Sequence, residues 1–227
     1  MAPWGWLGLA VLAVVASACG PPNLAVAPPA RPLVYVALGA SDAVGVGASD
    51  PVHEGWVPVL HSYLPAGTRL VNLGVSGSLL RDALVQQLPV AIDAAPDLVT
   101  VWLAVNDFNA RVPLEEYSAQ LDQLLGRLRG ETSAQVVIAN LPDLSRVPVY
   151  AAVPPELLRA EIGRWNAAIE RAARRHGAVL VDLYPLGPEL ASQPEYVGLD
   201  GFHPSAAGYR RLAEVMWAAI TANHLLP

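Results

Sequence analysis

The sequence contains no lysine, and all fourteen of its basic residues are arginine. A chain without lysine cannot form a Schiff base through a side-chain amine or pair a catalytic serine with a lysine base. It has one cysteine, Cys19, so no disulfide can form within the chain. Charged residues make up only 15% of the chain, and the formal net charge is −6. Because nucleic-acid binding depends on basic surfaces, this balance argues against a nucleic-acid partner.

Sequence signals for metals and nucleotides are missing as well. No cluster of histidine, cysteine and acidic residues has the spacing of a metal site. The isolated histidines are typical of ordinary surface or core positions, and they are His53, His61, His176 and His224. Residues 39–47 are rich in glycine, as phosphate loops are, but contain neither Gly-x-Gly-x-x-Gly nor Gly-Lys-Ser/Thr. We therefore expect no metal and no cofactor.

The first nineteen residues have the pattern of an export signal. Residues 7–15 form an apolar run that is too short to span a bilayer. The small residues before Cys19 resemble the lipobox of bacterial lipoproteins, although no basic residue precedes the run and Ala16 stands where leucine is usual. We expect an exported protein, anchored by lipid on Cys19 at the outer face of the cell membrane. A cleaved secretory signal, which would release the protein, and an uncleaved anchor are the alternatives.

A proline-rich linker and one folded domain follow. Residues 20–32 contain repeated prolines and are expected to form an extended, solvated tether. Residues 33–227 are long enough for a single domain with a full hydrophobic core, and 53% of the whole chain is hydrophobic. We see no second domain boundary.

Apolar, strand-like runs alternate with helical patterns through this domain. The runs are short and apolar nearly throughout, as in strands buried on both faces, and they cover residues 33–38, 68–73, 98–103, 134–139 and 178–182. The helical patterns cover residues 55–64, 79–92, 114–129, 155–176 and 205–223. This alternation predicts a doubly wound (flavodoxin-like) α/β sandwich, with a central five-stranded parallel sheet and helices on both faces.

The chemically active side chains fall where such folds bind ligands, beyond the carboxyl ends of the strands. Ser41 comes directly after the first strand, in a sharp strand-to-helix turn of the kind that exposes a nucleophile. Asp200 and His203 follow the last strand by a longer loop. At this spacing the carboxylate can accept a hydrogen bond from one ring nitrogen and leave the other free to act as a base. The chain thus contains both a histidine that can act as a base and a serine that this base can activate.

Four short blocks, in order along the domain, together resemble the SGNH hydrolases, the GDSL family of esterases and lipases. They are Gly-Ala-Ser with the glycine-rich segment after it, Asn-Leu-Gly-Val-Ser-Gly, Ala-Val-Asn-Asp and Asp-Gly-Phe-His, at residues 39–48, 72–77, 104–107 and 200–203. Ala40 replaces the aspartate usual in the family, and Ala104 replaces a glycine. Neither change removes a group that performs chemistry, and Asp42 is a candidate to replace the missing carboxylate in part.

This resemblance implies a role for each residue of the site. Ser41 would be the nucleophile, His203 the base, and Asp200 the carboxylate that orients the imidazole. The oxyanion hole would consist of the backbone N–H groups of Ser41 and Gly77 and the side-chain amide of Asn106. The alternative for each residue is a purely structural role, as a helix cap, a turn residue or a surface histidine. Asp42 and Asp107 are expected to be structural.

The expected function is that of a serine esterase that hydrolyses carboxylic esters through an acyl-enzyme on Ser41. Short-chain esters and lysophospholipids are the candidate substrates. The alternative is a catalytically silent lipoprotein that binds glycans or lipids on the same scaffold. The family also covers thioesters and O-acetyl sugars, and a fold does not choose among them. Residues 141–150 should border the acyl pocket, where Leu144, Val147 and Tyr150 favour an apolar group and Arg146 suits an anionic one.

Overall fold

The computed structural model describes Met1 and residues 31–226. Cys19, the predicted export signal around it and nearly all of the predicted linker lie outside the described residues. Pro32–Pro227 form one compact unit. Within the described part of the chain, no helix has both the length and the apolar character needed to cross a membrane.

A parallel sheet of five strands forms the centre of the domain, as predicted. Its strands are β1 (Val34–Gly39), β2 (Arg69–Asn72), β3 (Leu98–Trp102), β4 (Gln135–Ala139) and β5 (Val179–Val181). Their order in the sheet is β2-β1-β3-β4-β5, and every neighbouring pair is parallel. The chain therefore reverses its direction of winding between β1 and β3, which is where this fold opens a crevice for ligands.

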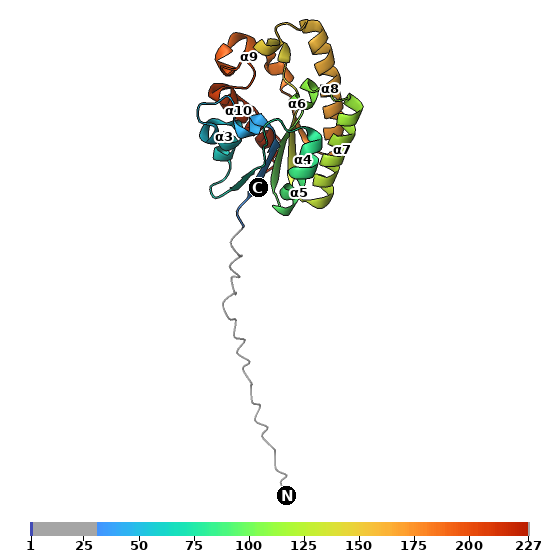
Figure 1. Ribbon diagram of the computed structural model, residues 1–227. Coiled ribbons are helices and arrows are strands. Elements are labelled where there is room, and N and C mark those ends of the chain that lie inside the picture. The colour runs from blue at the N-terminus through green and yellow to red at the C-terminus, as the bar shows by residue number, and fades with distance from the viewer. Residues whose placement is uncertain (2–30, 227) are drawn as a thin grey trace. The chain divides into compact units, whose positions relative to one another are not determined.

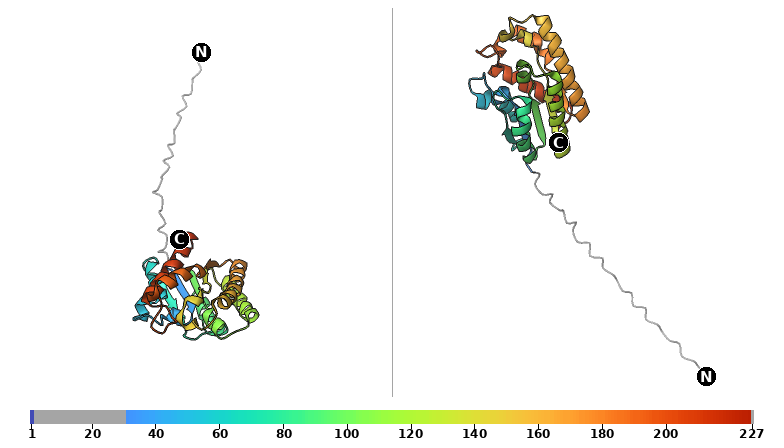
Figure 2. Two further views of the ribbon diagram at one scale, coloured as in Figure 1. Left: turned by 90° about the horizontal axis from the view of Figure 1, so that it is seen from above. Right: turned by 45° about the vertical axis from the view of Figure 1, so that its right-hand side comes forward.

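Helices cover both faces of the sheet because successive strand residues point to opposite sides. In β1, Tyr35 and Ala37 belong to one apolar cluster, whereas Val36 and Leu38 belong to the other. The first face is covered by α3 (Trp56–Tyr63) and α10 (Ala206–Ala222), on the left in Figure 1. The second face is covered by four helices, on the right in Figure 1: α4 (Leu80–Gln86), α5 (Leu88–Asp93), α7 (Leu114–Glu131) and α8 (Pro155–His176). The views in Figure 2 show α7 and α8 running side by side.

Short helices occupy the loops around the carboxyl ends of the strands. The α-helical turns are α1 (Ser41–Val44), α2 (Pro51–Glu54), α6 (Val105–Asn109) and α9 (Gly187–Ser192). The 3₁₀ turns are η1 (Leu144–Arg146), η2 (Pro148–Tyr150), η3 (Tyr184–Leu186) and η4 (Pro194–Tyr196). None of these short elements was predicted from the sequence, since each is too short to show a periodic pattern.

The prediction of one helix over residues 79–92 is wrong at Gln87, where the structure has two helices, α4 and α5. Pro89 lies in the first turn of α5 and has no N–H to donate to the preceding turn, so an unbroken helix is unfavourable there. Gln87 itself is buried at this break and only 1% exposed. The other predicted helices and strands end within one or two residues of the observed bounds.

Candidate active site

Ser41 lies in the tight turn between β1 and α1. Gly39 ends the strand, and a Cβ at this position would lie 2.5 Å from the Cβ of Ala43, so only glycine fits so tight a turn. Ala40 follows as a buried core residue, and Ser41 begins the helix. The turn thus holds the serine at the carboxyl end of β1, next to the crevice between β1 and β3.

The structure brings Ser41, His203 and Asp200 into one row of hydrogen bonds. His203 Nε2 lies 2.9 Å from Ser41 Oγ, and His203 Nδ1 lies 2.6 Å from Asp200 Oδ2. Because an ionised carboxylate can only accept, Nδ1 carries the proton and donates to Asp200. The lone pair of Nε2 then faces the serine hydroxyl. This arrangement can remove a proton from Ser41 as its oxygen attacks an electrophile.

Asp200 is itself fixed by its own loop. Its Oδ1 accepts hydrogen bonds from the backbone N–H groups of Phe202 at 2.9 Å and His203 at 3.0 Å. Desolvation opposes ionisation, but these bonds and the bond from the His203 ring outweigh it and hold the pKa of Asp200 below its usual value. The carboxylate therefore stays charged and oriented toward the imidazole at neutral pH.

The glycine-rich segment after Ser41 supports His203 from the other side. Gly47 has a φ of +102°, and a Cβ there would lie 2.8 Å from the Cβ of His203 and 2.4 Å from the carbonyl oxygen of Pro204. The hydroxyl of Tyr209 donates to the carbonyl of Val46 at 2.5 Å and ties the same segment to α10. The first and last sequence blocks thus pack directly against each other.

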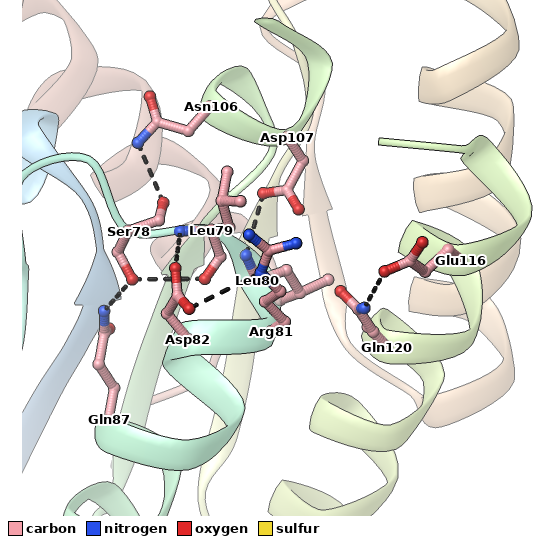
Figure 3. Close-up of polar contacts among 10 residues, drawn as sticks. All are labelled: Ser78, Leu79, Leu80, Arg81, Asp82, Gln87, Asn106, Asp107, Glu116 and Gln120. Atoms are coloured by element: carbon pink, nitrogen blue, oxygen red, sulfur yellow. Dashed lines mark hydrogen bonds and ion pairs between the residues drawn. The ribbon is translucent and has the colours of Figure 1, made fainter. Parts of the chain in front are cut away.

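The three residues expected to form an oxyanion hole come from neighbouring segments. Gly77 lies in an open turn with a φ of +80°, and among the described residues neither its N–H nor that of Ser41 has a hydrogen-bond partner. Asn106 lies at the start of α6 and donates from Nδ2 to the carbonyl of Ser78 at 3.0 Å, as Figure 3 shows. An amide nitrogen carries two hydrogens, so one remains for another acceptor. These free donors suit a developing negative charge.

Asn72 connects the Gly77 segment to the nucleophile turn. Its Nδ2 donates to the carbonyl of Ala43 at 2.6 Å, and its Oδ1 accepts from the N–H of Gly74 at 3.1 Å. The N–H of Val75 donates to the carbonyl of Gly39 at 3.3 Å. The second block is therefore bonded to both ends of the turn that carries Ser41.

Two further carboxyl groups lie close to the site. Asp42 lines a largely apolar cavity of about 80 Å³ beneath it, and burial raises the pKa of Asp42 to about 6 against the opposing effect of His203. Asp107 is 1% exposed, and its Oδ2 accepts from the N–H of Leu80 at 3.0 Å (Figure 3). Burial also raises the pKa of Asp107 to about 6. A buried acceptor at the first N–H of α4 fits the structural role expected for Asp107.

The structure divides the segment 141–150 between two hollows. Leu144 and Val147 are buried and line the 80 Å³ cavity beneath the site. Tyr150 lines a second, larger groove of about 550 Å³. Arg146 lies 3.9 Å from the carboxylate of Asp143. Of the three apolar residues that we expected at an acyl pocket, only Tyr150 therefore faces the larger space.

This larger groove was missed by the sequence analysis because its walls come from segments far apart in the chain. Residues that follow Asn106 in α6 and the next loop form one wall, and η2 and α8 form the other. Aromatic side chains in it include Phe108, Tyr150 and Trp165. The ring of Tyr150 packs edge-on against Phe202, which in turn packs against His203. The groove therefore begins within two side chains of the catalytic histidine candidate.

No metal site emerges from the described part of the chain. Nowhere in it do three or more histidine, cysteine or acidic side chains gather in a way that could hold an ion.

Comparisons with known proteins agree with this architecture. The profile of the GDSL-like Lipase/Acylhydrolase family matches residues 37–211. An acetylxylan esterase from Geobacillus stearothermophilus is 24% identical over 187 residues, which cover 74% of this chain and 82% of that protein. Among solved structures that share the fold, TesA has a TM-score of 0.70 at 23% identity and covers 85% of this chain and 99% of its own. The psychrotrophic esterase EstA from Pseudoalteromonas sp., in a form inhibited by monoethylphosphonate, has a TM-score of 0.68 at 18% identity and covers 83% and 97%.

The profile match spans most of the folded domain and contains every one of the four sequence blocks. It also runs from β1, which carries the serine, into α10, which follows the histidine. The chain therefore belongs to the GDSL-like lipase/acylhydrolase family and is a serine hydrolase of ester bonds.

Proposed function

We propose that this enzyme hydrolyses carboxylic esters through an acyl-enzyme on Ser41. The observation that carries the proposal is the continuous row of hydrogen bonds from Ser41 Oγ through both ring nitrogens of His203 to Asp200. The serine and the histidine are 162 positions apart, so this contact depends on the whole fold and not on local sequence.

His203 Nε2 accepts and donates each proton that is transferred in the proposed reaction. Ser41 Oγ bonds to the acyl carbon while His203 Nε2 takes its proton, and the resulting imidazolium gives that proton to the departing alcohol oxygen. Water then attacks the acyl carbon and loses a proton to Nε2. The C–O bond to Ser41 breaks as that proton returns to the serine oxygen, which releases the acid. Asp200 stays ionised and stabilises the imidazolium in both steps.

Free donors near Ser41 support the stabilisation of the negative charge in this reaction. The N–H groups of Ser41 and Gly77 and the second amide hydrogen of Asn106 would bind the carbonyl oxygen as it becomes an oxyanion. Such donors act most strongly on charge that exists only in the transition state.

The larger groove supports an ester with an apolar group longer than acetyl. It holds about 550 Å³ and is lined mainly by apolar and aromatic side chains, with Arg111, Arg164, Glu115 and Glu161 also in its lining. Arg164 is paired with Glu161 at 2.9 Å, so Arg111 is the arginine that suits an anionic substituent, such as the phosphate of a lysophospholipid. The acetylxylan esterase relative points instead to an O-acetyl sugar. A panel of p-nitrophenyl esters of increasing chain length, lysophosphatidylcholine and acetylated xylooligosaccharides would separate these substrates.

Turnover of p-nitrophenyl acetate tests the chemistry itself. We expect wild-type hydrolysis, its loss in Ser41→Ala, and its loss after treatment with a serine-directed organophosphate whose adduct mass spectrometry locates on Ser41. Ser62→Ala is a matched control, because Ser62 is exposed on α3 and lies outside the row of hydrogen bonds. A well-folded wild-type protein that neither turns over any ester of the panel nor takes up the label would instead favour the silent lipid- or glycan-binding protein.

We further propose that the protein is exported and carries lipid on Cys19. Support comes from the sole cysteine of the chain standing after an apolar run and before a proline-rich segment. Cys19→Ser should move the protein from the membrane fraction to the soluble fraction of its host. An unchanged membrane fraction would show that another segment holds it there.

A further inference from the structure

Gln87 stands out among the buried polar residues because both polar atoms of its side chain form hydrogen bonds, and their partners lie next to the site. The residue is 1% exposed. Its Oε1 accepts from the N–H of Gly39 at 3.1 Å, while its Nε2 donates to the carbonyl of Gly39 at 2.9 Å and to Ser78 Oγ at 3.2 Å. One amide thus joins the end of β1 to the residue that follows Gly77.

The contact with Gly39 has the form of strand pairing. Strand β2 ends at Asn72, which pairs with Ala37 of β1, so β2 ends before it reaches Gly39. The Gln87 amide bonds both the N–H and the C=O of Gly39, the two groups that a longer β2 would bond. The carbonyl of Gly39 also accepts from the N–H of Val75 at 3.3 Å, so Gln87 and Val75 together complete the edge of β1 two residues before Ser41.

Ser78 is the second partner, and it connects three parts of the site. Its hydroxyl accepts from Gln87, and its carbonyl accepts from Nδ2 of Asn106, as Figure 3 shows. Its own N–H donates to the carbonyl of Val75 at 3.0 Å and closes the turn that contains Gly77. Any shift of Ser78 would consequently move Gly77 and Asn106 relative to Ser41.

On the basis of the proposed roles of Ser41, Gly77 and Asn106, we infer that Gln87 is a positioning residue of the oxyanion hole. It contacts no substrate. Together with the bond from Val75 N–H to the Gly39 carbonyl, it fixes the distance between the nucleophile turn and the Gly77 loop (residues 73–79), because its amide bonds both Gly39 and Ser78. Only an amide can both accept from one backbone N–H and donate to two oxygens at this position.

Two substitutions isolate this role. Gln87→Met keeps the length of the side chain and removes all three hydrogen bonds. Ser78→Ala removes the bond from Gln87 to the Gly77 loop and the local bond from Ser78 Oγ to the carbonyl of Leu79 at 3.3 Å, but leaves the bonds to Gly39. The neighbouring Gln86 is exposed, so Gln86→Met is the matched control. Kinetics on p-nitrophenyl acetate and hydrogen–deuterium exchange of residues 73–79 are measured for each variant, with Ser41→Ala as the reference for background.

We expect Gln87→Met to lower kcat by about 10-fold to 100-fold, because displacement of a catalytic group by about 1 Å has an effect of this size. KM should change little, since a misplaced oxyanion hole affects the transition state more than substrate binding. Residues 73–79 should exchange faster, and Ser78→Ala should change exchange and kcat in the same direction. Because both changes break one connection, the double variant should be no slower than Gln87→Met. Gln86→Met should match the wild type.

The inference is overturned if folded Gln87→Met keeps both the wild-type kcat and the wild-type exchange of residues 73–79. It is also overturned if the losses of Gln87→Met and Ser78→Ala multiply in the double variant. If Gln87→Met does not fold, Ser78→Ala decides, because it leaves both bonds between Gln87 and Gly39 in place. Should Ser41→Ala retain activity, the proposed function fails while the exchange data still decide whether Gln87 holds the loop.

Discussion

The two halves of the candidate site are built in different ways. Asp200 and His203 lie on an irregular segment, and the side chain of Asp200 is 43% exposed. The other half is almost completely buried at Ser78, Gln87 and Asp107. Gln87 donates to the hydroxyl of Ser78, and Asp107 accepts from the N–H of Leu80, two residues after Ser78 in the chain. An exposed segment beside His203 lets water reach the imidazole, which acts as its base in the second half of the proposed reaction. Donors that must meet a transient charge without rearrangement work best in a rigid, buried network.

The largest effect is expected from the exposed half. His203→Ala should lower kcat by about 10⁵-fold or more, toward the background of the uncatalysed reaction, because Ser41 then has no base. The measurement is single-turnover and steady-state hydrolysis of p-nitrophenyl acetate. His224→Ala, near the C-terminal end of the described chain, is the control and should be as active as the wild type. If His203→Ala keeps more than about a tenth of the wild-type kcat, another group must take the serine proton.

A smaller loss is expected from the buried half. Asn106→Ala should reduce kcat by about 10²-fold to 10³-fold, with KM changed little, since its amide acts on charge that appears only in the transition state. The variant should be compared with Asn223→Ala, which alters an exposed asparagine at the end of α10. A folded Asn106→Ala enzyme with unchanged kcat on an ester whose acylation limits the rate would remove Asn106 from the oxyanion hole.

The pH dependence of stability should have opposite signs in the two halves. Asp107 has a folded pKa of about 6, above its unfolded value, so its contribution to stability is full below the unfolded pKa of about 3.9 and is lost as the pH rises through 6. Relative to the wild type, Asp107→Asn should gain about 1 to 3 kcal/mol of unfolding free energy between pH 4 and pH 7. Asp200 has a lowered folded pKa, so its contribution is present above the unfolded pKa and is lost as the pH falls through the folded value. Because the unfolded pKa is about 3.9 and the folded pKa lies below it, Asp200→Asn should lose stability relative to the wild type mainly as the pH rises from about 2 to about 5.

Urea unfolding of the three proteins at each pH measures these trends. Parallel curves for Asp107→Asn and the wild type would show that Asp107 does not titrate with a raised pKa.

The smallest effect is expected at Gly77. A Cβ there would meet no heavy atom within 4 Å, so the cost of Gly77→Ala is the left-handed backbone with φ of +80°, about 1 kcal/mol of stability. Gly47→Ala should be worse for activity, because its Cβ would overlap the Cβ of His203. Thermal unfolding and kcat of the two variants, measured together, provide the check. Equal losses of kcat would show that packing beside His203 matters no more than strain beside the oxyanion donors.

The parts of the fold that the sequence predicts well are those in which burial dictates composition. The strands were located closely because parallel strands covered on both faces need apolar residues throughout. The row from Ser41 to Asp200 was expected because the four blocks fall at the ends of such strands, in a known order. The short helices in segment 183–204 were not predicted, since such short turns have no periodic pattern.

Gln87 was missed for a different reason. Its place in an apolar helical pattern suggested an ordinary helix residue, and Pro89 was the only local sign of a break. Its partners, Gly39 and Ser78, lie 48 and 9 positions away, so that no pattern in the neighbouring sequence could have identified them. The same holds for the larger groove, whose walls meet only in the folded chain.

The distance of 162 positions between Ser41 and His203 also bears on how the enzyme matures. The serine is made early in synthesis and the histidine late, and α10, which packs on α3, follows the histidine. Contacts between distant parts of a chain form late and slowly in folding, and parallel sheets are rich in them. Under the proposed mechanism, a nascent or partly folded chain should therefore not hydrolyse esters. Recovery of activity during refolding would mark the final step, in which the C-terminal part of the domain joins the part that was synthesised first.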